Sequence, residues 1–88
     1  MAINNYTDSQ IEQIIKDHIV QKFMYNQPHV NLDNDLPLIA EGIIDSMSLF
    51  KLAGFLEEKF GFTLNPDEFV TDNFATVNAV KSLVVKKM

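Results

Sequence analysis

The sequence predicts an all-α fold: a small up-down bundle of three longer helices and one short helix, with a long loop between the first two helices. Apolar residues recur at helical spacing in three separate stretches. The chain has 88 residues, 47% of them hydrophobic, which is enough for one core. We therefore expect a single domain over residues 1–88, with its core at about 7–85. The β-branched pair Val84-Val85 has no partner strand elsewhere in the chain.

The first helix is predicted to begin at Thr7, because Thr7 and Gln10 have the spacing of a capping box. It should end around Asn26-Gln27-Pro28. His18 lies within the apolar arc, and no second metal ligand stands at helical spacing from it. We therefore interpret His18 as a partly buried histidine rather than a metal ligand. The apolar positions of this helix are Ile11, Ile14, Ile15, Ile19 and Phe23.

A long connection runs from Pro28 to Asp45, and Pro28 and Pro37 prevent a continuous helix through it. Loops of this length in small domains are usually functional or held to the core. Asp33 begins a run that resembles a calcium loop, but Pro37 occupies its fifth position and Leu38 stands where the turn glycine should be. These two residues argue against a calcium site. The residues able to hold the loop to the core are Val30, Leu32, Leu36, Leu38, Ile39, Ile43 and Ile44.

The second helix is predicted from Ser46 to Phe60, with Asp45 as its N-cap, Gly42 as a break before it and Gly61 as its end. Helical spacing places two sets of residues on opposite faces. The buried face should carry Leu49, Leu52, Ala53, Leu56 and Phe60. The opposite face should carry Ser46, Met47, Phe50, Lys51, Gly54, Glu57 and Glu58.

Two further helices complete the prediction. Pro66-Asp67-Glu68-Phe69 places proline and acidic residues in a first turn, which predicts a short helix. Thr76 is a plausible cap for a last helix that has lysines near its end. The apolar positions of this last helix are Val77, Val80, Leu83 and Val84.

Ser46 is the residue best suited to carry a covalent modification. A helix start exposes unpaired N–H groups and a partial positive charge, so a phosphodiester on this hydroxyl would lie where an anion is favoured. A plain first-turn serine would have the same local sequence. The motif Glu41-Gly42-Ile43-Ile44-Asp45-Ser46-Met47, followed later by Gly61-Phe62, resembles the modification site and second helix of the acyl carrier protein family. Met47 stands where that family has leucine, a side chain of similar volume.

The resemblance implies that Ser46 carries 4'-phosphopantetheine taken from coenzyme A, with Asp45 as the flanking acidic residue. Its thiol would hold acyl groups as thioesters. The implied partners are a phosphopantetheinyl transferase and the acyl-loading and chain-modifying enzymes. The chain itself contains no cysteine, so that thiol must come from outside the sequence.

Ser48 and Lys51 stand where fatty-acid carriers commonly have acidic residues, and the net charge over 45–60 is only −1. This favours a specialised, polyketide-like pathway over a housekeeping fatty-acid role, although a fatty-acid-related pathway is compatible. Met47 after Asp-Ser also resembles carriers of activated amino acids, so an aminoacyl or peptidyl (D-alanyl-like) carrier is an alternative. An unmodified helical interaction module is another.

Met47 and Phe50 are large apolar residues on the face that should meet water. Exposed apolar residues bordered by charge are typical of partner docking. We therefore predict a docking stripe on the second helix; cover by the long loop or the third helix is the competing interpretation. The stripe consists of Met47, Phe50, Lys51, Gly54, Glu57 and Glu58.

The charge of the chain narrows its partners. Twelve acidic residues against seven lysines give a net charge of −5, which argues against nucleic-acid binding. Four acidic residues between Asn31 and Met47 either attract enzymes with basic docking faces or serve as solvated loop charge. They are Asp33, Asp35, Glu41 and Asp45.

Several other functions are not expected. No Gly-x-Ser-x-Gly elbow surrounds Ser46, and His18 and His29 are isolated, so we expect no catalysis by the chain itself. There is no metal-ligand spacing, membrane-span-length apolar run or signal-peptide pattern. We therefore expect a cytoplasmic monomer that has no metal and does not insert into a membrane.

Overall fold

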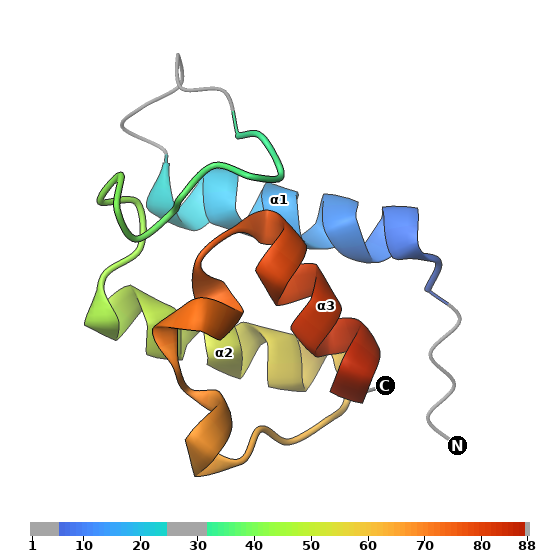
Figure 1. Cartoon of the computed structure of the whole chain (residues 1–88). Coiled ribbons are helices and arrows are strands. Elements are labelled where there is room, and N and C mark those ends of the chain that lie inside the picture. The colour runs from blue at the N-terminus through green and yellow to red at the C-terminus, as the bar shows by residue number, and fades with distance from the viewer. Residues whose placement is uncertain (1–5, 25–31, 88) are drawn as a thin grey trace.

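The computed structural model describes residues 6–24 and 32–87, and within these ranges all regular structure is helical. The elements are α1 (Asp8–Phe23), α2 (Ser46–Phe60), the 3-10 turns η1 (Pro66–Glu68) and η2 (Thr71–Phe74), and α3 (Val77–Lys87). Figure 1 shows α1 and α2 running in opposite directions, with α3 across the space between them. The all-α prediction is confirmed.

Local capping explains where α1 begins. The Thr7 hydroxyl accepts the Gln10 N–H at 3.1 Å, and the Thr7 N–H donates to Gln10 Oε1 at 2.9 Å. This is the predicted capping box. The helix ends at Phe23, before the predicted Asn26, because the Met24 backbone leaves the helical region while its side chain is buried in the core. Predictions on residues 25–31, including Pro28, His29 and Val30, lie outside the described residues.

One apolar core joins all three helices and the loop before α2. The five predicted residues of α2 are all buried, from Leu49 to Phe60. The loop contributes Leu38, Ile43 and Ile44, each no more than 5% exposed. The prediction that the described part of the loop is held to the core is therefore confirmed. The remaining core residues are Ile11, Ile15, Ile19, Met24, Leu64, Phe74, Val77, Val80, Leu83 and Val84.

The C-terminal part also follows its capping signals. The predicted short helix is η1, in which the Asn65 N–H donates to Glu68 Oε1 at 2.8 Å. Thr76 caps α3 as predicted, since its hydroxyl accepts the Ala79 N–H at 3.0 Å. A second turn, η2, was not predicted separately, and it places Phe74 in the core with no exposed surface. None of the helices in the described ranges is long and apolar enough to cross a membrane.

Candidate functional site

The loop before α2 delivers Ser46 from a tightly bonded turn. The Leu38 carbonyl accepts the N–H groups of both Ile43 and Ile44, at 2.9 and 3.2 Å. Gly42 lies within this turn at φ 75°, a conformation that glycine adopts at low cost. Because the Ile43 and Ile44 side chains are buried, the chain leaves the core immediately before the helix starts.

Asp45 forms the N-cap of α2, as predicted. Its Oδ1 accepts the Ser48 N–H at 2.8 Å, which satisfies one of the unpaired donors of the first turn. Hydrogen bonding from Ser48, first from its backbone and then from its side chain, lowers the pKa of Asp45. Asp45 is therefore a carboxylate at neutral pH. Ser46 is the first helical residue and is exposed, so its hydroxyl is accessible from solvent.

The predicted docking stripe lies mostly at the surface. Met47 is 69% and Phe50 is 61% exposed, so neither the described loop nor α3 covers them. Lys51, Gly54 and Glu58 are exposed as well. Glu57 is half-buried, and its Oε2 accepts the Leu64 N–H at 2.8 Å. Glu57 therefore ties the segment after α2 back to the helix.

An apolar extension of this surface was not predicted. The Phe50 ring stacks on Phe69, which follows η1, with ring centroids 5.3 Å apart. The next residue, Val70, is 46% exposed. The exposed apolar surface thus continues from α2 to the link between η1 and η2. The sequence gives no signal for this contact, because the pair is nineteen residues apart.

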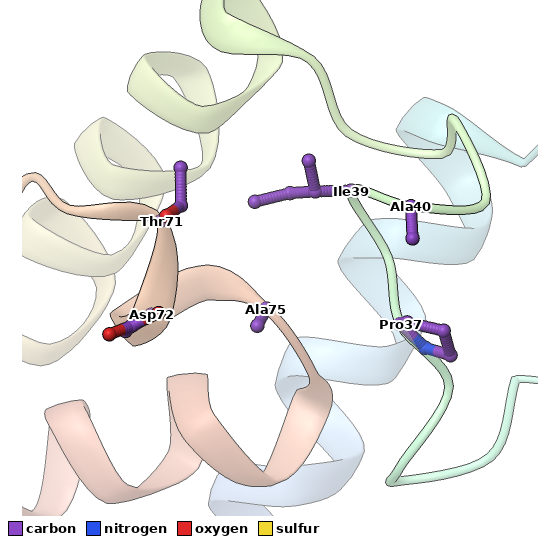
Figure 2. Close-up of a pocket in the computed structure, with 6 residues that line it drawn as sticks. All are labelled: Pro37, Ile39, Ala40, Thr71, Asp72 and Ala75. Atoms are coloured by element: carbon purple, nitrogen blue, oxygen red, sulfur yellow. The ribbon is translucent and has the colours of Figure 1, made fainter.

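A shallow pocket of about 330 Å³ lies between the loop before α2 and η2 (Figure 2). Ile39 projects into the space between the two segments, whereas the Asp72 carboxylate points away from Pro37. A backbone hydrogen bond of 2.8 Å from the Leu38 N–H to the Ala75 carbonyl joins the two sides. The pocket walls are mainly apolar and suit a small apolar group. The lining residues are Pro37, Ile39, Ala40, Thr71, Asp72 and Ala75.

His18 lies where α1 faces α2. Its ring stacks on Phe55 at 3.7 Å and meets the edge of Phe23 at 5.8 Å. Burial, followed by the nearby Lys22 charge, lowers the pKa of His18. The described residues contain no group of three histidine, aspartate or glutamate side chains able to hold a metal ion.

The acidic residues predicted between Asn31 and Met47 have different roles in the structure. The Asp35 carboxylate accepts a hydrogen bond of 2.7 Å from the Asn78 side chain at the start of α3. The Asn34 carbonyl accepts the Asn78 N–H at 3.1 Å. This part of the loop is therefore fixed to α3, whereas Glu41 and Asp45 are exposed close to Ser46 in the chain.

The helical fold and the exposed serine at a helix start are compatible with a small carrier domain. Residues 13–84 match the family described as the phosphopantetheine attachment site, and the chain belongs to this family. It is also 31% identical over 74 residues to a probable acyl carrier protein, PigG, from Serratia sp. (strain ATCC 39006). That similarity covers 84% of each chain.

The family consists of carrier proteins, and its prosthetic group is covalently attached 4'-phosphopantetheine. The position of Ser46 in the structure suits the attachment of this group. Ser46 combines an exposed hydroxyl with the N-terminal end of a fifteen-residue helix, where the backbone favours a phosphodiester.

Proposed function

We propose that Ser46 is the attachment residue and that the protein is an acyl carrier that performs no chemistry alone. The observation that carries this proposal is the exposed Ser46 hydroxyl at the first position of α2, directly after the Asp45 cap. The similarity to a probable acyl carrier protein supports an acyl cargo. When bound, the group supplies a thiol that holds the cargo as a thioester.

The chain contributes position and charge. Ile43 and Ile44 are buried and fix the start of α2 from the core side, while Ser46 lies exposed at the surface. The N–H groups of the first turn and the helix dipole stabilise the phosphodiester. Asp45 caps the helix without covering the serine, because its Oδ1 turns back to the Ser48 N–H.

The pathway that we propose is a specialised one. Lys51 is exposed one turn beyond Met47, where fatty-acid carriers commonly have an acidic side chain. A partner that recognises a strongly acidic second helix would find little charge on α2. An aminoacyl or peptidyl cargo is the second candidate, favoured by the Asp45-Ser46-Met47 sequence.

We further propose that partner enzymes dock on the exposed face of α2. Met47 and Phe50 supply its apolar centre, and Phe69 with Val70 extend it toward η2. Burying each large apolar side chain contributes about 1.5 to 3 kcal/mol, which is enough for a transient complex. Lys51, Gly54 and Glu58 border this centre, whereas Glu57 acts mainly within the fold.

Intact mass spectrometry tests the attachment residue. The apo protein is incubated with coenzyme A and a broad-specificity phosphopantetheinyl transferase, and we expect a gain of one phosphopantetheinyl group. Ser46→Ala should abolish the gain. Ser48→Ala is the matched control, since Ser48 lies two residues further along the same turn. A wild-type protein that stays unmodified would leave the unmodified interaction module as the better interpretation.

A further inference from the structure

The lysines of the described residues divide into two groups. Lys16 and Lys81 pair with Glu12, at 3.8 and 3.2 Å, and Lys87 pairs with Glu68 at 2.9 Å. The other four, Lys22, Lys51, Lys59 and Lys86, form no ion pair with any described carboxylate. Of these four, Lys22 and Lys51 come from different helices but line the same feature of the surface.

That feature is a hollow of about 300 Å³ lined by His18, Lys22, Phe23 and Lys51, which we call the basic hollow. All twelve acidic residues of the chain fall within the described ranges, and none of them lines it. In a chain of net charge −5, this is a local reversal of charge. No aspartate or glutamate occurs in residues 1–5, 25–31 or 88, so those residues offer no acidic side chain to neutralise it.

The position of the basic hollow links it to the docking stripe. Lys51 belongs to both, and it follows the exposed Phe50 directly on α2. The opposite wall is firm, because His18 is stacked on Phe55 and contacts Phe23. A protein that covers Met47 and Phe50 would therefore also approach two lysines that lack a counter-charge.

We propose that the basic hollow receives an acidic side chain of the enzyme that loads this carrier, when that enzyme docks on the exposed face of α2. Charge complementarity supports a carboxylate, since the lysines gain a partner only in the complex. The apolar stripe beside the hollow favours a protein as the source of that carboxylate. The identity of the partner rests on the proposed carrier function.

Charge reversal in the producing cell tests the proposal. Lys22→Glu and Lys51→Glu variants are expressed in place of the wild type, and each isolated protein is analysed by intact mass for its arm and its load. The load is counted only among molecules that carry the arm, so that any effect on arm attachment is removed, and we expect this loaded fraction to fall about tenfold, as for the loss of a contact between opposite charges. Lys22→Gln and Lys51→Gln should give smaller losses in the same direction.

Lys59→Glu is the matched control, because Lys59 is exposed on α2 and lies outside the basic hollow. We expect its loaded fraction to match that of the wild type. Equal loading of all variants would overturn the proposal while leaving the carrier function intact, whereas a wild-type protein without the arm would overturn the carrier function. Thermal melts of the purified variants must match, so that a loss of loading cannot come from unfolding.

A second measurement observes the hollow directly. Imidazole NMR signals of His18 are followed while the purified holo protein is titrated with the loading enzyme, and then separately with inorganic phosphate. We expect the enzyme to raise the His18 pKa in the wild type and not in Lys51→Glu. A response to phosphate at millimolar concentration, with none to the enzyme, would overturn the proposal in favour of a small-anion site.

Discussion

Asp45 influences both the stability of α2 and the placement of Ser46. Replacing it with alanine removes the acceptor of the Ser48 N–H, and we expect the melting temperature to fall by about 4 to 8 °C, as for the loss of an N-cap in a domain of this size. Asp45→Asn keeps the cap and should fall less. Circular dichroism melts at neutral pH measure both. Equal losses in the two variants would show that charge, rather than capping, is the main contribution.

The lowered pKa of Asp45 adds a pH dependence with a definite sign. Because the folded state binds the proton more weakly than the unfolded state, the Asp45 contribution is full above the unfolded pKa. It is lost as the pH falls through the folded pKa. We therefore expect the stability difference between wild type and Asp45→Asn to shrink at low pH, as followed by urea unfolding from pH 7 to pH 3.

His18 should destabilise the fold in mild acid. Burial and the Lys22 charge lower its pKa in the folded protein, so the unfolded chain takes up the proton first as the pH falls below the ordinary value. Stability present at pH 7.5 is therefore partly lost by pH 5.5. His18→Gln should flatten this dependence in urea unfolding. If the unfolding free energies of wild type and His18→Gln depend on pH in the same way, the acid sensitivity arises elsewhere in the molecule.

The two faces of α2 should respond differently to substitution. Leu56 is fully buried, so Leu56→Ala should cost about 2 to 5 kcal/mol of unfolding free energy. Phe50 is mostly exposed and touches Phe69, so Phe50→Ser should cost about 1 kcal/mol or less. Loading of the holo Phe50→Ser protein should nevertheless fall clearly. A large loss of stability in Phe50→Ser would argue against a docking role.

Each helix shows why part of the structure could be predicted from the sequence. Thr7 with Gln10, Asp45 and Gly61 act on residues within one or two turns of themselves, so capping and helix bounds are local problems. The buried face of α2 follows from spacing alone. The proposed attachment residue, Ser46, was predicted because its local sequence resembles a known site, and the chain belongs to the family that the resemblance indicated.

The features that were missed depend on contacts between distant residues. Lys22 and Lys51 lie on different helices, and only their packing creates the basic hollow. Phe50 meets Phe69 because η1 returns the chain beside α2. Glu57 was predicted as a docking residue because helical spacing alone places it outward, but its bond to the Leu64 N–H depends on the turn at Gly61.

At the scale of the whole molecule, polar side chains at the surface link different elements to one another. Glu12 of α1 bonds to Lys81 of α3, which lowers the pKa of Glu12, and Lys87 at the end of α3 bonds to Glu68 of η1. Surface ion pairs contribute little individually. We therefore expect added salt to change the unfolding midpoint only slightly, and the apolar core to dominate overall stability.

Substitution of Phe74 tests whether the apolar core dominates the stability of the fold. Phe74 is fully buried where η2 packs on α3, and it directly precedes Ala75, whose carbonyl accepts the Leu38 N–H. Phe74→Ala should cost about 3 to 5 kcal/mol, a large part of the roughly 4 to 13 kcal/mol expected for a domain of this size. Val85→Ala, at a residue 46% exposed, is the control and should change stability by about 0.5 kcal/mol or less.

Urea unfolding measures both variants, and amide hydrogen exchange adds the link to the site. Because Leu38 also anchors the turn before Ser46, its amide should exchange faster in Phe74→Ala than the global loss of stability explains. Exchange at Leu38 that follows only the global unfolding would mean that the serine-bearing turn is held by Ile43 and Ile44 independently of η2. Either result identifies which part of the core keeps the Ser46 hydroxyl in place.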